Sequence, residues 1–147
     1  MIGIEIKNIN DARATFASIM LEASKAKEII CQNGRSNNSQ KVSIISTNLL
    51  EEILSNYSFR PELLYCEETK QNEILLKEIN IYAYSETKEQ AKEDLLDLVE
   101  EYVEQYLSDT EKYMKFENYR KHYPYILRIA HCTGREEIRR LLFDGNM

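Results

Sequence analysis

Residues 87–107 carry the pattern that most restricts the fold of this chain. Thr87 and Gln90 stand at the spacing of a capping box, in which the hydroxyl accepts the backbone N–H of the third residue and the amide side chain returns the bond. Apolar side chains then recur at spacings of three and four, the period of a helix with one buried face: Ala91, Leu95, Leu98, Tyr102 and Tyr106. The pattern predicts one long helix that ends near Leu107, with most of its acidic side chains off the buried stripe.

The first 58 residues predict a smaller α+β domain with the element order βαββα. Its first strand is indicated by the alternation of Ile2, Ile4 and Ile6 with other residues. An amphipathic helix capped at Asn10 or Asp11 and ending near Lys25 should follow, with a buried side made of Ala12, Phe16, Ile19, Ala23 and Ala26. Residues 28–31 and 42–45 then predict a hairpin around the Asn33-Gly34 turn. A second helix should begin near Thr47 and bury Leu49, Leu50, Ile53 and Leu54.

Residues 59–147 predict a second domain. We place the boundary after residue 58 because residues 56–61 lack periodicity and Pro61 disfavours helix at Arg60. A small antiparallel sheet and a mostly helical remainder should follow; its strands are expected at residues 63–67, 74–76 and 79–83. Beyond the long helix, others should start near Asp109 and at a Thr133–Glu136 capping box, the last closed by Gly145. Residues 125–132 fit either a Pro-initiated helix or a strand, and we favour the helix.

Charge is distributed unevenly along the chain, whose net charge is -6. Residues 86–111 hold ten acidic side chains against Lys88 and Lys92, whereas residues 112–147 hold eight basic side chains against four acidic ones. The two blocks either pair with each other or form separate faces for partners, and we favour internal pairing with solvation. The net charge argues against a protein that coats nucleic acid electrostatically, but residues 1–58, with six charges of each sign, are not excluded from binding DNA.

Several classes of function lack their sequence signals. Cys31, Cys66 and Cys132 have no C-x-x-C spacing, which disfavours a disulfide scaffold and a zinc site and fits a reducing cytoplasm. No apolar run approaches the roughly 18 residues that span a bilayer, and no glycine-rich phosphate loop occurs. His122 and His131 are the near-neutral bases, and His131 and Cys132, as sequence neighbours, point in different directions along a regular element. We therefore expect no enzyme activity, no cofactor, no metal and no membrane segment.

Tyrosine is concentrated in one segment. Six tyrosines lie between residues 102 and 125, interleaved with basic side chains. Such a segment can stack on bases and neutralise phosphates. It can equally bury its rings in a core or a protein interface while the hydroxyl groups stay wet. We favour core or partner-protein contact over nucleic acid.

The N-terminal segment resembles the Phd/YefM class of antitoxins from type II toxin–antitoxin systems with RelE/RelB-type pairing. The resemblance rests on the Ala12-Arg13 pair, on Phe16 three positions later, on the Asn33-Gly34-Arg35 turn, and on the strand and helix VSIISTNLLEEIL. It implies a dimer that binds operator DNA through residues 1–58, represses its own operon, and neutralises a toxin with residues 59–147. The DNA-binding residues expected on this basis are Lys7, Asn10, Arg13 and Arg35. Residues 85–91 also resemble the strand-to-helix turn of HicB-type antitoxins.

Our hypothesis is therefore a cytoplasmic antitoxin whose partners are a toxin, operator DNA and a second copy of itself. RelE-like ribonuclease toxins are small and basic, so the acidic face of the long helix is their natural electrostatic counterpart. The toxin-binding residues expected on that face are Glu93, Asp97, Glu100, Glu101 and Glu104. The alternative is a small-ligand-binding or structural interaction module without DNA or toxin. In either case we expect the C-terminal domain to be folded before a partner arrives.

Overall fold

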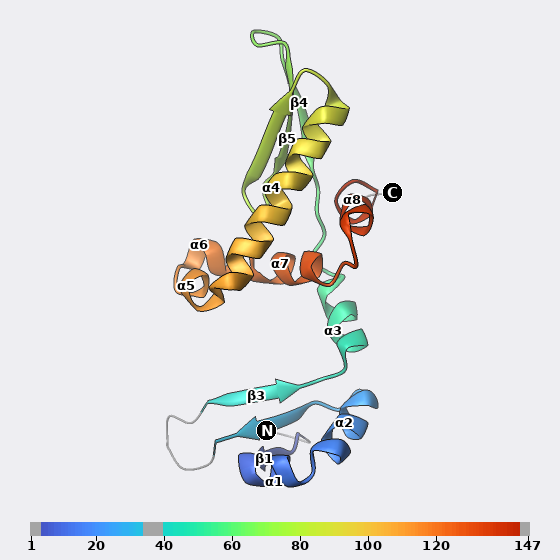
Figure 1. The fold of residues 1–147 in the computed structure, drawn as a ribbon, viewed down its shortest axis with the longest axis vertical. Helices are drawn as coiled ribbons and strands as arrows, with labels where there is room; N and C mark the ends of the chain where they lie inside the picture. Colours follow the sequence, from blue (N-terminus) through green and yellow to red (C-terminus); the bar gives the residue numbers. More distant parts are fainter. Residues whose placement is uncertain (1–3, 34–39, 145–147) are drawn as a thin grey trace. The chain divides into compact units, whose positions relative to one another are not determined.

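The computed structural model describes residues 4–33 and 40–144 (Figure 1). The chain divides into two compact units, Met1–Ile53 and Leu54–Met147, each with its own three-stranded sheet. The expected mixed α+β fold with two small sheets and several helices is confirmed. Among the described residues, no helix combines the length and the apolar character needed to cross a bilayer.

In the described residues, the first unit contains a three-stranded sheet, two short helices that precede its central strand, and α3 (Thr47–Leu54) at its C-terminal end. Its other elements are β1 (Ile6–Asn8), α1 (Ile9–Ala14), α2 (Phe16–Ser24), β2 (Ile29–Gln32) and β3 (Lys41–Ile44). The central strand β2 pairs in parallel with β1 and antiparallel with β3, so that Ile30 lies opposite Ile6 and Ser43. A parallel pair requires a crossover, and α1 and α2 supply it.

The helix expected after the first strand differs from the prediction in two ways. Its N-cap is Asn8, whose Oδ1 accepts the backbone N–H of Asn10 at 3.0 Å, so neither Asn10 nor Asp11 is the cap. The helix is also interrupted at Thr15, where the hydroxyl donates to the Asp11 carbonyl at 2.7 Å. Phe16, the first residue after the break, is 55% exposed, although Ile19 and Ala23 of the same predicted stripe are buried.

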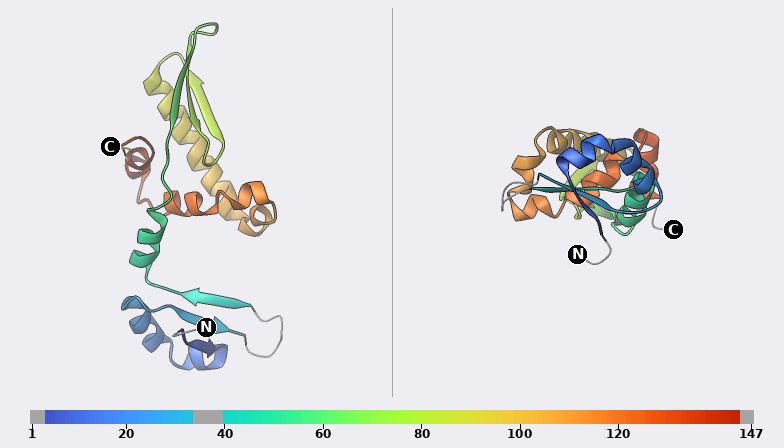
Figure 2. Two further views of the ribbon diagram at one scale, coloured as in Figure 1. Left: turned by 180° about the vertical axis from the view of Figure 1, so that it is seen from behind. Right: turned by 90° about the horizontal axis from the view of Figure 1, so that it is seen from below.

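The second unit is a three-stranded antiparallel sheet covered on one face by a long helix. Its elements are β4 (Glu62–Cys66), β5 (Gln71–Leu76), β6 (Ile81–Ser85), α4 (Lys88–Ser108), α5 (Thr110–Met114), α6 (Glu117–Arg120), α7 (Tyr123–Ala130) and α8 (Arg135–Phe143). The strand order is β4-β5-β6, and α4 packs across β5 and β6. The view from behind in Figure 2 shows this sheet in front of α4. Residues 125–130 are helical, as favoured, with Pro124 in the first turn of α7.

One continuous core holds the second unit together. Its buried side chains come from the sheet (Ile74, Leu76, Ala83), from α4 (Ala91, Leu95, Leu96, Val99, Val103, Tyr106), from α7 (Ile126, Ile129) and from α8 (Ile138, Leu142). The predicted α4 stripe was right at Ala91, Leu95 and Tyr106 and wrong at Leu98, which is exposed. The buried arc is wider than one stripe because α4 packs against α7 and α8 as well as against the sheet.

The capping box at α4 was predicted in part, and the one at α8 was wrong, because the N-cap of α8 is Gly134 and no side chain caps it. Thr87 accepts the backbone N–H of Gln90 at 3.1 Å, but the Gln90 amide donates to Asp94 instead of returning the bond. At α8, the Thr133 hydroxyl and backbone N–H both donate to Glu137, not Glu136, at 2.6 and 3.0 Å. Gly145, the expected helix stop, lies outside the described residues.

Leucines 95 and 98 on α4 test the position of the buried face. We expect Leu95→Ala to lower the free energy of unfolding by about 2–5 kcal/mol, because it leaves a cavity where no solvent reaches. Leu98→Ala on the same helix should cost no more than about 0.5–1 kcal/mol, since that side chain is already exposed. Urea unfolding followed by circular dichroism measures both, and equal losses would contradict the assigned core.

Candidate interaction surfaces

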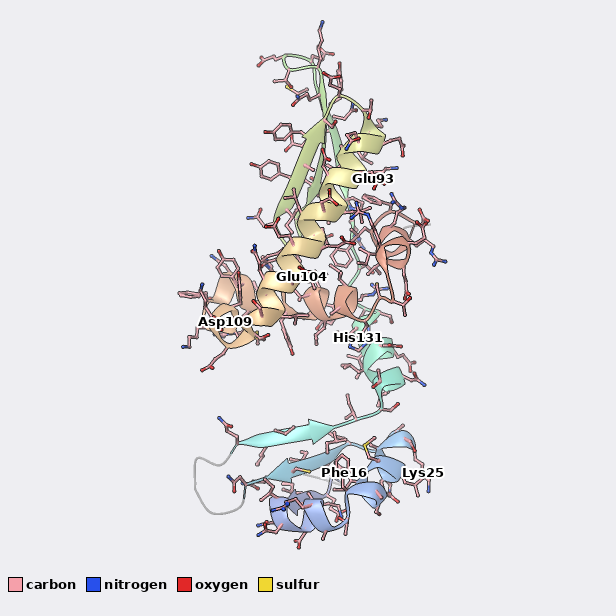
Figure 3. All side chains as sticks on the ribbon, in the orientation of Figure 1. Phe16, Lys25, Glu93, Glu104, Asp109 and His131 are labelled. Carbon is pink, nitrogen blue, oxygen red and sulfur yellow. The ribbon has the colours of Figure 1, made fainter. Side chains whose placement is uncertain are left out.

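The acidic face of α4 is engaged by two arginines from α8. Arg135 donates through Nη1 to Asp97 at 2.8 Å and to Glu100 at 3.0 Å. Its Nη2 donates to the carboxylate and to the backbone carbonyl of Glu93, both at 3.1 Å. Arg139, one turn further on, donates to Glu93 as well and to Glu136 at 3.3 Å. Glu93, at the upper end of α4 in Figure 3, is thus the shared acceptor of both guanidinium groups.

This network joins part of the acidic block to part of the basic block. Glu93, Asp97 and Glu100 pair internally, which is the alternative that the sequence favoured. Glu101 and Glu104 point elsewhere and are exposed, and Glu101 accepts only a weak bond from Gln105 at 3.2 Å. The five acidic residues expected on one toxin-binding face therefore fall into a paired group and an open group.

The arginines of α8 were not among the residues singled out from the sequence. A usable signal was present, because Arg135 and Arg139 are four residues apart and so share one face of their helix. Hydrogen bonds from Arg139 and Arg135 hold the pKa of Glu93 below its ordinary value of 4.5. Three carboxylates on α4 nevertheless share two guanidinium groups, so this patch keeps an excess of negative charge.

The tyrosine-rich segment is largely a core. The Tyr106 ring is fully buried, stacks on Tyr113 with ring centroids 4.7 Å apart, and donates its hydroxyl to the Tyr119 carbonyl at 2.7 Å. The Tyr102 ring meets the edges of both Tyr106 and Tyr113. Rings that pack on one another in this way are not available to stack on bases. A role in the core therefore accounts for most of the cluster.

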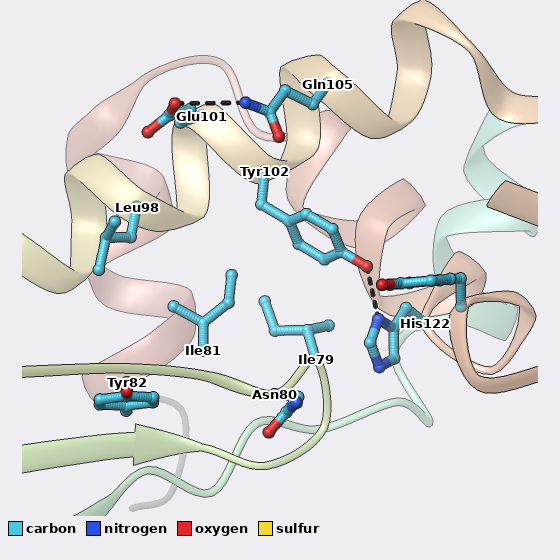
Figure 4. Close-up of a pocket in the computed structure, with 10 residues that line it drawn as sticks. Ile79, Asn80, Ile81, Tyr82, Leu98, Glu101, Tyr102, Gln105 and His122 are labelled. Atoms are coloured by element: carbon cyan, nitrogen blue, oxygen red, sulfur yellow. Dashed lines mark hydrogen bonds between the residues drawn. The ribbon is translucent and has the colours of Figure 1, made fainter.

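A groove of about 430 Å³ lies beside this cluster, between β6 and α4 (Figure 4). At its inner end, Tyr102 Oη and His122 Nδ1 share a hydrogen bond of 2.6 Å. Burial raises the pKa of Tyr102 and lowers the pKa of His122, so both groups are neutral near pH 7. A neutral pair of this kind anchors the loop after α6 to α4 and adds no charge to the groove.

The surroundings of Cys132 do not favour a reactive thiolate beside His131. The Cys132 thiol donates to the Arg128 carbonyl at 3.7 Å, and burial raises its pKa. A nucleophilic cysteine needs the opposite shift, toward the thiolate. His131 is the C-cap residue of α7.

The residues expected to bind DNA differ in their exposure and in the interactions that they make. Lys7 forms an ion pair with Glu5 at 3.2 Å and is only 22% exposed. The backbone N–H of Asn10 donates to the side chain of the Asn8 cap, and α1 has only six residues. Arg13 is exposed in the last turn of α1. Arg35 lies outside the described residues.

Comparisons with known proteins agree over nearly the whole chain. Residues 1–143 match the PHD-like family, described as the antitoxin of RelE/RelB toxin–antitoxin (TA) systems. A crystal structure from Syntrophomonas wolfei subsp. wolfei, described as the antitoxin part of a candidate toxin/antitoxin system, superposes with a TM-score of 0.78 at 17% sequence identity, covering 95% of this chain and 96% of that one. At that identity the superposition shows a shared fold. No curated protein matches the sequence.

The pairing of α8 with α4 can be tested through its dependence on salt and pH. Arg135→Ala should lower the midpoint of thermal unfolding at about pH 7, and the loss should shrink in about 1 M salt, which screens exposed charges. The pKa of Glu93 is lowered in the folded chain, so its contribution is present above pH 4.5 and is lost as the pH falls through the lowered value. The difference between wild type and variant should therefore close in acid.

The matched control is Arg140→Ala, an exposed arginine on the same helix. Thermal unfolding followed by circular dichroism at about pH 7 and about pH 3 compares the three proteins. A loss for Arg140→Ala as large as that for Arg135→Ala, or a gap that does not change with pH, would contradict the network.

Proposed function

Because this chain belongs to the PHD-like family of RelE/RelB-system antitoxins, we propose that it neutralises a small, basic, RelE-like ribonuclease toxin by direct occlusion and represses its own operon as a DNA-bound dimer. The observation that carries this proposal is the family match itself, which extends across both compact units. The first unit is then assigned to dimerisation and operator DNA, and the second to the toxin.

The toxin role draws support from the open part of the acidic face of α4. Glu101 and Glu104 are exposed there, and the exposed side chains of Leu98 and Leu107 flank them on the same helix. Carboxylates beside apolar side chains suit a protein partner with basic and apolar groups better than they suit a nucleic acid. The paired residues Glu93, Asp97 and Glu100 add to the negative potential that a basic toxin meets as it approaches.

The dimer role draws support from the apolar surface of the first unit. The buried cluster there is small and centres on Ala12, Ile19 and Ile29. Larger apolar side chains remain exposed around it: Ile6, Ile9, Phe16, Met20, Leu21 and Val42. Phe16 and Met20 are one turn apart on α2 and so share a face. An exposed apolar pair on one helix face suits an interface between protein chains.

The DNA role rests on fewer residues than expected. Arg13 is exposed, and the dimer would present it twice, together with two copies of Arg35. Lys7 and Asn10 remain proposed contacts, but Lys7 would have to leave its ion pair with Glu5 to reach a phosphate. We therefore place most of the phosphate affinity on the two arginines.

Neutralisation can be tested with the product of the adjoining short reading frame. Co-expression with the wild-type chain should restore growth that this product alone arrests. The double variant Glu101→Lys and Glu104→Lys should bind the product at least about tenfold more weakly, with a smaller dependence on salt, because charge attraction becomes repulsion. Glu86→Lys with Glu89→Lys, at the start of the same helix, makes an equal change in net charge and should bind within about twofold of wild type. Growth arrest that the wild-type chain does not relieve would refute the toxin role.

Operator binding can be tested with DNA from upstream of the chain's own gene. Arg13→Ala combined with Arg35→Ala should weaken binding in a gel-shift assay by at least about tenfold, since each dimer loses four cations. Lys112→Ala with Lys115→Ala removes the same charge from the second unit and should leave binding unchanged. Retained affinity in the arginine variant would count against the DNA role assigned to these residues.

A further inference from the structure

The groove between β6 and α4 combines an apolar wall with polar side chains, one of them acidic. Ile79 and Ile81 line it from the sheet side, Leu98 lines it from the helix, and Tyr82 stands at its mouth (Figure 4). Glu101 lies on the rim, and among the described residues no lysine or arginine lines the groove. His122 closes the inner end in its neutral form, held by Tyr102. The groove therefore has one apolar wall and a single charged side chain, which is negative.

The strand that borders the groove has an open edge. In the described part of the chain β6 pairs with β5 on one side, and no strand pairs with its other side. The backbone N–H and C=O groups of alternate β6 residues consequently face outward without a strand partner. An open edge next to an apolar groove can accept an extended peptide, which forms ladder bonds to the strand and places alternate side chains in the groove.

Exposed aromatic rings lie on the other face of β6, which points away from α4. Tyr82 and Tyr84 are 55% and 59% exposed, and their rings stack with centroids 6.5 Å apart. On the same face of the sheet, Glu73 lies opposite Tyr84, so a second carboxylate stands beside the rings. Exposed tyrosines bordered by charge are enriched in the energetically important parts of protein interfaces.

We propose that the toxin inserts an extended segment with alternating apolar and basic side chains along β6, as a fourth strand of this sheet. Its apolar side chains, which share one face of the added strand, fill the groove between Ile81 and Leu98. Its basic side chains lie on the other face, where Glu73 stands beside Tyr84. This inference rests on the proposed function, and it extends the toxin contact from the exposed face of α4 around the open edge of the sheet. Charge complementarity selects the occupant, because the carboxylates of Glu101 and Glu73 attract a cationic segment and repel a nucleic acid.

The opposite edge of the sheet supplies matched controls. Strand β4 is also unpaired on its outer side, and its Tyr65 is 58% exposed, but it does not line the groove. Leu63 on β4 is 52% exposed, compared with 41% for Leu98 on α4, and only Leu98 lines the groove. Tyr82→Ser and Leu98→Lys therefore test the groove, while Tyr65→Ser and Leu63→Lys make the same changes outside it.

The experiment measures the affinity of the full chain for the purified product of the adjoining reading frame. We expect Tyr82→Ser and Leu98→Lys each to weaken binding by at least about tenfold, and the two controls to stay within about twofold of wild type. Compared with the free chain, the wild-type complex should show slower hydrogen exchange at the backbone amides of residues 81–85 and no change at residues 62–66. Thermal unfolding of each variant checks that the chain is folded.

The outcomes separate this inference from the function on which it rests. If the wild-type chain neither binds nor neutralises the product, the proposed function fails. If wild type binds and the groove variants bind equally well, the toxin contact lies elsewhere and the groove assignment is overturned. Loss of affinity in Tyr65→Ser with protection at residues 62–66 would overturn it in favour of β4. Groove variants that lose only self-association, measured by light scattering, would overturn it in favour of a second copy.

Discussion

The packing of α4 across β5 and β6 is the interaction on which the rest of the second unit depends. A three-stranded sheet has two faces, and burial of Ile74, Leu76 and Ala83 requires a cover. A helix of 21 residues is long enough to pass the end of the sheet, so its C-terminal half is free to organise α5, α6 and α7 around Tyr106. Removing α4 would leave each of these parts without a core.

The acidity of α4 follows from the same packing. Side chains that cannot enter the core must be solvated or paired, and α8 pairs three of them through Arg135 and Arg139. The apolar side chains Ile138 and Leu142 bury α8, so its attachment does not depend on exposed ion pairs alone. Among the other carboxylates of α4, Glu101 lines the groove beside the open edge of the sheet.

A folded second unit changes how an antitoxin can recognise its toxin. A disordered tail must be ordered on binding, and the entropy lost reduces the affinity obtained from a given contact area. Here the groove, its tyrosines and its carboxylates are held in place by a continuous core before any partner arrives. The first unit differs, because its buried cluster is small and its largest apolar side chains remain exposed for the proposed second copy.

Sequence periodicity alone determined the mixed α+β class, the long helix after Thr87 and the helix after Pro124, because local hydrogen bonding and apolar spacing specify these features. The charge counts located the acidic and basic blocks, and short motifs in the N-terminal segment carried the resemblance to antitoxins. Periodicity could not place Phe16, which follows the break at Thr15, or Leu98, because tertiary packing decides which face of α4 the core covers. Only the tertiary structure decided which carboxylates are paired, since Arg135 lies 35 to 42 positions away from its acceptors. The groove beside β6 has the same origin: its walls come from a strand, a helix and a loop that only folding brings together.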